Sequence, residues 1–472
     1  MFSNLPNEIL SRIFSHLLTE YQKQRMAWDE SLDDIADVRL VCRLWNDLAT
    51  EQLFRTLTLH NTVDTQESHF DSWQRLLDSV SIQKAVRRVA FESSLEDDTG
   101  SCTTGLRQYH FVNAAISRIS DMPRLDAVEI RFASCCAGRN ANRVPWIPHM
   151  ELPDPEPAEV RFDTLISLIQ AMYDRGLSES VTTIRELVLD NFQNMPLPED
   201  IAEYLFEDIQ RLHIKIVSEN YGKIYPDEER PDLIHRDELR EFPIYLQNTL
   251  LPSVADQLVE LTLAGKHWAG IPGEFNGRGL LFSKLKTLTL DGFDILRDDQ
   301  FNWVLNQKSL TSLHLHNCTI GTHCRVEQPN FAHWNVNLRD WLQDGAVYPV
   351  QRLEPGQQLQ PGWYMNHLRW DNIFNSIQES LPLLQDFSFD RKPWEVYFRH
   401  NDEVTFAGEM ELRYLAFSGR WFEPPRRHYY ERSELQKSMP VCSAEELDKN
   451  DPTDRKALDN LVRTVVARRS GK

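Results

Sequence analysis

The sequence predicts an α+β chain with a small all-α module at its N-terminus. An irregular α/β solenoid of parallel strands with outer helices follows. Two observations predict this fold class. The first fifty residues contain two apolar stripes with helical spacing. Further along, a leucine pattern recurs three times at spacings of 27 and 25 residues, which is the size of one strand and one returning helix.

Composition restricts the class of protein. The 472 residues carry 51 Lys and Arg against 71 Asp and Glu, a net charge of −20, which disfavours binding to nucleic acid or to an anionic membrane surface. The hydrophobic fraction of 41% supports a packed core. Seven cysteines do not form an evident disulfide framework. With no signal peptide and no apolar run of about 18 residues recognised, we expect a cytoplasmic or nuclear protein, or one found in both.

The first predicted helix covers residues 4–18. Leu5, Ile9, Ile13 and Leu17 recur every four residues, with a second apolar row beside them. Pro6 suits the first turn of a helix, where its missing N–H costs nothing. The charged segment 20–34 is predicted to be a loop or a frayed helix.

A second helical pattern covers residues 34–49. Leu40, Leu44 and Leu48 form one row, and Val38, Val41 and Trp45 form another. Two such helices offer more apolar surface than a module of fifty residues buries by itself. Either the rest of the chain or a partner protein must cover the surplus.

These two segments resemble the F-box, a small helical module that docks onto the Skp-type adaptor of cullin-RING ubiquitin ligases. The resemblance rests on Leu-Pro-x-Glu-Ile-Leu-x-x-Ile-Phe from Leu5 and on Leu-Val-Cys-Arg-x-Trp-x-x-Leu-Ala from Leu40. The connection over residues 20–34 is longer than the family's usual link. By resemblance, the adaptor-facing residues are Leu5, Pro6, Ile9, Leu10, Ile13, Phe14, Leu40, Val41, Cys42 and Trp45. Some of them must hold the module together instead. The alternative is an ordinary amphipathic hairpin that packs on its own domain.

The repeated pattern places Leu at positions i, i+3 and i+5 in residues 258–265, 285–292 and 309–318. Its central leucines are Leu261, Leu288 and Leu313. Such spacing points alternate side chains inward on a short strand. Weaker copies centre on Leu57, Val89, Val128, Leu187, Leu212, Phe387 and Leu415. Helices are predicted over residues 73–80, 112–119, 162–173, 201–206, 301–306 and 370–380.

This pattern resembles the leucine-rich repeat, and Cys318 falls where that family carries Asn or Cys. The whole chain therefore resembles an F-box/leucine-rich-repeat protein of a kind common in fungi. The predicted domains are the F-box at 1–52, an irregular solenoid with long insertions at 53–420, and a charged, frayed C-terminal tail at 421–472. Residues 145–160 are predicted to be an extended surface loop.

Outward residues of the repeat strands are candidates for binding a basic or polar segment of a client protein, although they also fit a solvated sheet face. They include Glu186, Asp190, Glu260, Thr262, Thr287, Thr289, Asp291, Ser312, His314 and His316. A second docking candidate is the Trp-rich segment 334–370, whose tryptophans otherwise pin a long loop to the solenoid.

A zinc site built from His314, His316, Cys318, His323 and Cys324 is disfavoured, because His314 and His316 point outward while Cys318 turns into the core. We find no motif for a phosphate loop, a nucleophile or a metalloprotease. The sequence therefore predicts a non-enzymatic substrate adaptor of an SCF-type ubiquitin ligase, without a cofactor or metal. The alternative is an interaction scaffold outside any ligase.

Overall fold

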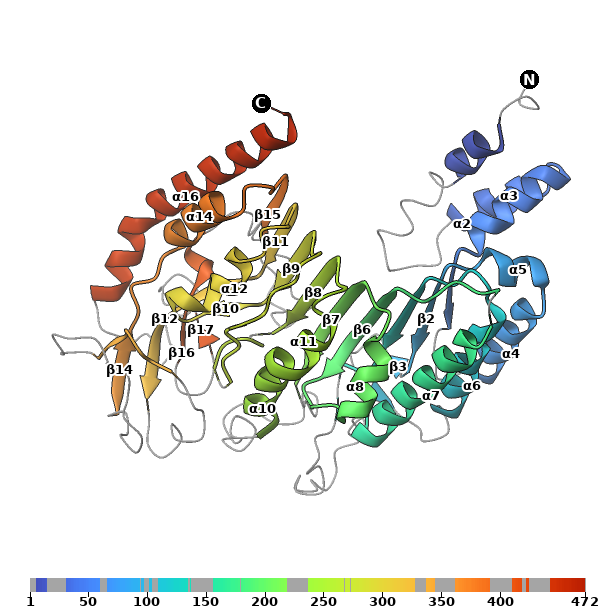
Figure 1. The fold of residues 1–472 in the computed structure, drawn as a ribbon, viewed down its shortest axis with the longest axis horizontal. Helices are drawn as coiled ribbons and strands as arrows, with labels where there is room; N and C mark the ends of the chain where they lie inside the picture. The colour runs from blue at the N-terminus through green and yellow to red at the C-terminus, as the bar shows by residue number, and fades with distance from the viewer. Residues whose placement is uncertain are drawn as a thin grey trace. The chain divides into compact units, whose positions relative to one another are not determined.

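The structure is a computed structural model. It describes residues 6–14, 31–59, 66–93, 95–96, 102–103, 109–134, 136, 156–178, 180–218, 237–266, 268–271, 273–326, 337–343, 361–390, 410–417, 422–423 and 442–471. The chain forms two compact units, whose helices and strands are labelled in Figure 1. Unit 1 comprises residues 1–191 and 220–222, and unit 2 comprises residues 192–219 and 223–472. Both have a mixed α/β fold whose main sheet strands are parallel.

Unit 1 begins with an N-terminal helical module, which consists of a helix over residues 7–14, α2 (Ser31–Val38) and α3 (Arg43–Leu53). Its core contains Leu10, Phe14, Ile35 and Ala49. The rings of Phe14 and Trp45 meet edge-on with centroids 5.4 Å apart. The prediction of one helix over residues 34–49 is wrong, because the chain turns at residues 39–42 and Cys42 has extended backbone angles.

Four parallel strands follow the module in unit 1: β1 (Thr56–Leu59), β2 (Arg88–Glu92), β5 (Ala127–Arg131) and β6 (Glu186–Gln193, which ends in unit 2). Leu57, Val89, Val128 and Leu187 lie side by side in this order, so these predicted repeat centres are confirmed as strand neighbours. The connecting helices are α4 (Gln66–Leu77), α5 (Val80–Ala85), α6 (Tyr109–Ser117), η2 (Arg118–Asp121) and α7 (Ala158–Gly176). A small antiparallel pair joins β3 (Leu95–Glu96) and β4 (Cys102–Thr103).

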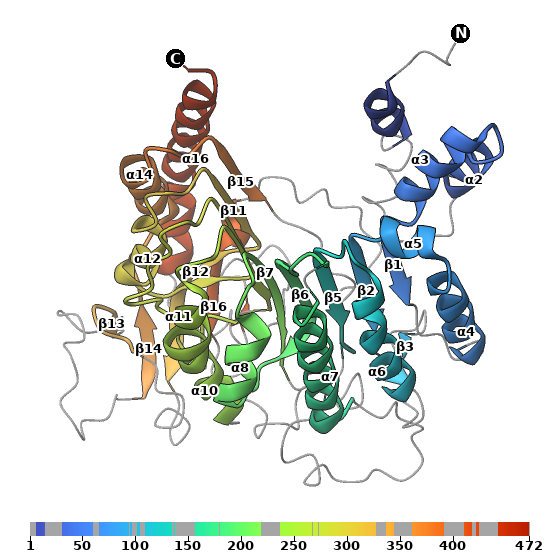
Figure 2. The same ribbon diagram turned by 45° about the vertical axis from the view of Figure 1, so that its right-hand side comes forward.

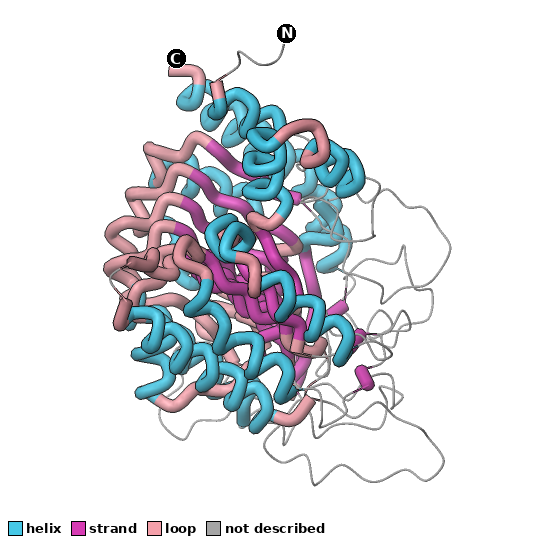
Figure 3. Tube along the Cα trace, turned by 90° about the vertical axis from the view of Figure 1, so that its right-hand side faces the viewer, coloured by secondary structure: helices cyan, strands magenta, loops and turns pink. Residues whose placement is uncertain are grey.

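Unit 2 contains five further parallel strands. They are β7 (Arg211–Val217), β8 (Glu260–Gly265), β9 (Thr287–Asp291), β11 (Ser312–His316) and β15 (Asp386–Asp390). Figure 3 draws the strands of the chain in magenta and the helices in cyan. The repeat centres Leu212, Leu261, Leu288, Leu313 and Phe387 pair in register, and the four leucines are fully buried. Alternate residues point away from the core, as the leucine spacing predicted.

Helical segments also precede the strands of unit 2. They are α8 (Glu199–Phe206), α10 (Asp237–Tyr245), η5 (Leu246–Leu250), α11 (Leu251–Val254), η6 (Asp298–Phe301), α12 (Asn302–Leu305) and α14 (Trp370–Ser380). Each of the six helices predicted along the chain has a counterpart, and α14 begins and ends where predicted. Trp370, Ile373, Phe374 and Ile377 of α14 are buried, as expected from their shared face.

A left-handed residue recurs at one position along three of the strands, inside β6 and directly after β9 and β11. Asn191, Gly292 and Asn317 each lie four residues after a repeat centre, and each has a positive φ of 56°, 70° and 49° respectively. Asn and Gly tolerate this left-handed backbone better than other residues. The side chain of Asn317 also donates a hydrogen bond to the Asp291 carboxylate at 2.8 Å.

A second sheet in unit 2 was not predicted. It has the order β13-β14-β12-β16-β17, and β10 (Asp294–Ile295) pairs with β12 (Thr319–Val326). The other members are β13 (Leu342–Gln343), β14 (Gly362–Met365), β16 (Tyr414–Phe417) and β17 (Phe422–Glu423). Leu415 pairs with Gly321 in this sheet, so its assignment as a repeat copy is wrong.

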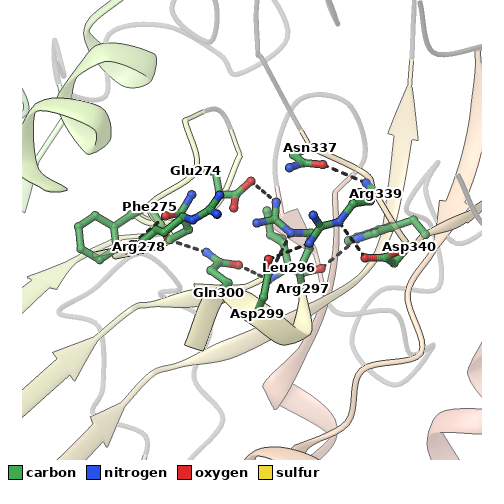
Figure 4. A network of polar contacts seen from close by, with 12 residues as sticks. Glu274, Phe275, Arg278, Leu296, Arg297, Asp299, Gln300, Asn337, Arg339 and Asp340 are labelled. Carbon is green, nitrogen blue, oxygen red and sulfur yellow. Dashed lines mark hydrogen bonds and ion pairs between the residues drawn. The ribbon is translucent and has the colours of Figure 1, made fainter. Parts of the chain in front are cut away.

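Polar contacts attach the turn at residues 339–340, which precedes β13, to the rest of unit 2 (Figure 4). The nearly buried guanidinium of Arg297 contacts Glu274 at 2.5 Å and Asp299 at 2.9 Å. Arg339 contacts the other oxygen of Asp299 at 2.8 Å. Asp299 therefore joins the turn at residue 339 to η6.

Buried aromatic side chains complete this attachment. Trp341 is 1% exposed and donates through its indole nitrogen to the Leu296 carbonyl at 2.9 Å. Trp363 and Tyr364 are also buried. Within the described part of segment 334–370, the tryptophans thus pin the chain to its own core and do not form the proposed docking surface. Trp334 lies outside the described residues.

The chain ends in a long helix, α16 (Cys442–Arg469), which lies beside α14 (Figure 2). The prediction of a frayed tail is therefore wrong for these residues. Ala457, Leu461 and Val465 recur every four residues and are buried. No described helix is both long and apolar enough to cross a membrane.

Candidate functional site

The N-terminal helical module leaves large apolar side chains exposed. Ile9 and Ile13 are 45% and 44% exposed, Leu40 is 83% exposed, and Val41 is 61% exposed. Leu44 at 42% belongs with them. We call Ile9, Ile13, Leu40, Val41 and Leu44 the exposed apolar set. Scattered apolar side chains are normal on a protein surface, but five in so small a module suggest that another molecule covers them.

Helix geometry explains why one row of apolar side chains on the first helix is buried and the next row is exposed. Residues four apart share a side of a helix, so Leu10 and Phe14 form one row while Ile9 and Ile13 form the next. The first row packs against α2 and α3, and the second does not. A hydrogen bond from the Gln52 side chain to Ser11 Oγ at 2.9 Å holds the helix against α3.

The turn between α2 and α3 presents the other members of the set. Cys42 is the N-cap of α3, and it is exposed along with Leu40 and Val41. The turn begins at Arg39, whose guanidinium lies 5.5 Å from the ring centroid of Phe54 at the end of α3. Arg39 thus holds the turn that carries Leu40 and Val41 against the end of α3.

The predicted adaptor-facing residues separate into two groups. Leu10 and Phe14 are buried and Trp45 is half-buried in the module core. Pro6, Ile9, Ile13, Leu40, Val41 and Cys42 are exposed. Leu5 lies outside the described residues. The prediction omitted Leu44, although its place in the row Leu40–Leu44–Leu48 was a signal that could have found it.

A comparison with protein-family models decides the class of this module. Residues 2–60 match the F-box-like family. The N-terminal module is an F-box-like domain. No curated protein matches the chain.

The F-box-like domain joins the first sheet through a very short connection. Only Phe54 and Arg55 separate α3 from β1. The Arg55 carbonyl accepts hydrogen bonds from the backbone N–H groups of Arg87 and Arg88 at 2.8 and 3.1 Å. Glu51 of α3 contacts Arg87 at 3.0 Å, so the end of α3 is tied to the start of β2.

The outward face of the unit 2 strands carries eight of the ten predicted client-binding residues. Most are partly exposed, but His316 is buried at 7% exposure. His314 Nδ1 lies 2.8 Å from Ser388 Oγ, and its Nε2 lies 3.7 Å from an Asp386 oxygen.

The same arrangement occurs at a second place on this face. His213 lies 2.8 Å from Thr262 Oγ1 and 4.0 Å from an oxygen of Glu260. A histidine is therefore held twice between a hydroxyl and a carboxylate of the next strand. The face therefore presents hydroxyl, imidazole and carboxylate groups.

Glu186 and Asp190 lie in unit 1, where the environment differs. Glu186 forms an ion pair with Arg88, which also contacts Glu129 at 2.9 Å, and Arg131 contacts Glu129 at 2.7 Å. Burial by itself raises the pKa of Glu129, but Arg131 and Arg88 outweigh it and hold the pKa below its ordinary value. Glu186 belongs to this structural ion-pair network.

The residues considered for zinc do not converge. His314 and His316 stack with their rings 6.0 Å apart, while Cys318 is buried and donates toward the carbonyls of Leu290 and His316. Burial raises the pKa of Cys318 to about 12 and lowers that of His323 to about 4. Over the described ranges, we find no group of three or more His, Cys, Asp or Glu side chains that could hold a metal.

Proposed function

We propose that this chain is a substrate-recognition adaptor of a cullin-RING ubiquitin ligase of the SCF type. Its F-box-like domain would dock a Skp-type adaptor through the exposed apolar set, and the strands that follow would bind a client protein. The observation that carries the proposal is the exposure of Ile9, Ile13, Leu40 and Val41 in a matched F-box-like domain. Covering such side chains stabilises a complex by about 25 cal/mol per Å² of apolar surface buried.

The mechanism is proximity. A client bound to the chain would meet a charged conjugating enzyme at a high effective concentration, and the chain itself would perform no bond chemistry. The short α3–β1 connection holds the F-box-like domain close to the first strands of unit 1. We place this activity in the cytoplasm or the nucleus, without nucleic acid, membrane or cofactor.

Client binding is assigned to the outward face of the unit 2 strands. Its half-exposed Glu260, Thr289 and His314 present varied polar groups on neighbouring strands. Extended strand faces of repeat proteins are common binding surfaces. The client class that fits best is a protein segment with polar or basic side chains.

A binding experiment with a matched control tests the adaptor proposal. The full chain carrying Ile9→Ala, Ile13→Ala, Leu40→Ala and Val41→Ala should lose at least tenfold in affinity for a purified Skp-type adaptor, measured by isothermal titration calorimetry. The control carries Ile166→Ala and Leu177→Ala, which remove equally exposed side chains of unit 1 at α7. The control should bind as the native chain does. Equal binding by all three proteins, or no binding by the native chain, contradicts the proposal.

An interaction scaffold outside any ligase is the alternative, favoured if the chain binds the adaptor without promoting ubiquitin transfer. Turnover of proteins that bind the chain distinguishes the two functions. Cells carrying the fourfold variant should accumulate the clients of a ligase adaptor, whereas the partners of a scaffold should keep their half-lives.

A further inference from the structure

Helix α7 is apolar on two sides. Its inner side packs within unit 1 through Leu165, Leu168 and Ala171, which are buried. The outer side carries a second set of apolar side chains, and its Ile166 and Tyr173 are 50% and 63% exposed. A surface helix usually has one apolar stripe and a polar opposite side. The outer side of α7 therefore has the composition of a face that another element covers.

The outer apolar side chains follow a regular spacing. We call Phe162, Ile166, Ile169 and Tyr173 the α7 stripe, whose members are four, three and four residues apart. Alternating steps of three and four residues form the seam along which two helices pack. Leu177, the C-cap residue, continues this spacing and is 70% exposed. The spacing therefore favours another helix as the partner.

Two buried arginines fix which side of α7 points outward. In the first turn, the Arg161 guanidinium contacts Glu156 at 2.6 Å and donates to the Asn191 carbonyl at 2.7 Å. In the last turn, Arg175 donates to the Met122 carbonyl at 2.6 Å. The two arginines are 4% and 3% exposed. A rotation of α7 that buried the stripe would break these contacts, so the stripe is a fixed part of the surface.

The exposed charges of α7 are all acidic. Glu159, Asp163 and Asp174 are exposed along the helix, whereas its two arginines are the buried ones. Helix geometry places the three carboxylates along one flank of the stripe. Asp174 accepts a hydrogen bond from Gln170 of the same helix at 2.8 Å, and a neutral amide leaves its charge uncompensated. Basic side chains on a partner would therefore complement this flank.

Charge also distinguishes this partner from other occupants of the stripe. Two copies of the chain joined through α7 would bring Asp163 and Asp174 of one copy against the acidic flank of the other. An anionic membrane surface would be repelled by the same carboxylates. A basic amphipathic helix meets neither penalty.

We propose that the α7 stripe binds an amphipathic helix with basic flanks, presented by a partner protein. Tyr173 is its principal anchor, since aromatic side chains with a polar tip are enriched among the residues that dominate binding energy. Ile166 contacts the partner two turns earlier. The stripe shares no residue with the exposed apolar set, so this proposal does not rest on the proposed function.

Two synthetic helical peptides test the proposal on the full chain. Both carry leucine at alternating steps of three and four residues, and their flanking positions carry lysine in one peptide and glutamate in the other. Fluorescence anisotropy at about 0.15 M salt measures binding. The lysine peptide should bind at least tenfold more tightly than the glutamate peptide. Equal binding of the two peptides, or no binding of the lysine peptide, would overturn the proposal.

Substitutions in the stripe separate specific docking from general attraction to an acidic protein. Ile166→Ser with Tyr173→Ser leaves the charge unchanged and should weaken the lysine peptide at least tenfold. The control carries Val80→Ser and Leu281→Ser, at side chains that are 58% and 62% exposed elsewhere. It should bind the peptide as the native chain does. A smaller loss in the stripe variant, or an equal loss in the control, would contradict the proposal.

A charge reversal tests the acidic flank. Asp163→Lys with Asp174→Lys should weaken the lysine peptide at least tenfold and improve binding of the glutamate peptide. An unchanged preference would mean that the flank plays no part. Sedimentation that shows a dimer of the native chain but a monomer of the stripe variant would identify a second copy as the occupant and overturn the proposal. Adaptor binding should be native in the stripe variant, so its absence in the native chain would contradict the proposed function alone.

Discussion

Leucines in the F-box-like domain and in the unit 2 sheet have opposite environments. Leu288 is fully buried between Leu261 and Leu313 of the neighbouring strands, whereas Leu40 is 83% exposed. Both belong to regular leucine patterns in the sequence. The leucines of the sheet are covered because each strand has neighbours of the same pattern and helices on the side toward which the leucines point. Three short helices have too little volume to cover theirs, so exposure, and not leucine content, distinguishes this surface from a core.

The largest test of this comparison removes one leucine from each region. Leu288→Ala should lower the free energy of unfolding by about 4 kcal/mol, because the surrounding ladder cannot collapse into the cavity. Leu40→Ala should change it by less than about 0.5 kcal/mol, as expected for an exposed side chain. Urea denaturation followed by circular dichroism measures both. A similar loss in the two variants would mean that Leu40 is covered by the chain itself.

A smaller effect is expected within the F-box-like domain, where adjacent residues have opposite roles. Phe14 is 3% exposed and packs on Trp45, so Phe14→Ala should destabilise the domain by about 3 kcal/mol. Ile13→Ala should leave its stability within about 0.5 kcal/mol of the native value. Hydrogen exchange of the α3 amides reports this local stability. Faster exchange in Ile13→Ala than in Phe14→Ala would reverse the assignment of the two rows.

The smallest effect concerns the ion pair at the junction. The side chains of Glu51 and Arg87 are 43% and 26% exposed, and such pairs contribute about 0.5 kcal/mol or less. Glu51→Gln should therefore shift the unfolding midpoint only slightly, and the shift should disappear in 0.5 M salt. A loss above about 2 kcal/mol would show that the junction depends on this pair more than on its backbone hydrogen bonds.

Strand register was predictable because each repeat carries its own apolar pattern within a few residues of sequence. Leu261, Leu288 and Leu313 pair where their spacing predicted, and the less regular centres at Val89 and Val128 pair in the same way. The bounds of α14 were predictable for the same reason, since one apolar face extends from Trp370 to Ile377.

Features that depend on distant segments were missed. β12, β14 and β16 have no common spacing, so nothing local predicted the second sheet. The break at residues 39–42 could not be seen in the sequence, because Leu40, Leu44 and Leu48 keep a four-residue helical spacing from the turn into α3. In α16, charged residues concealed the row of Ala457, Leu461 and Val465, although its four-residue spacing was present in the sequence.

The adaptor-facing set could be predicted only as a whole. Sequence spacing cannot tell Ile9 from Leu10, because both lie on the apolar side of one helix. Their separation requires the positions of α2 and α3, which cover Leu10 and not Ile9.

The two-residue connection between α3 and β1 has a geometric consequence. With Arg55 hydrogen-bonded to the start of β2, the connection cannot swivel without breaking those bonds. A protein bound at Leu40 would therefore set the orientation of β1 and β2 as well as their distance from it. Lengthening this connection by a few flexible residues would leave the exposed apolar set intact but free the three N-terminal helices to turn relative to β1 and β2.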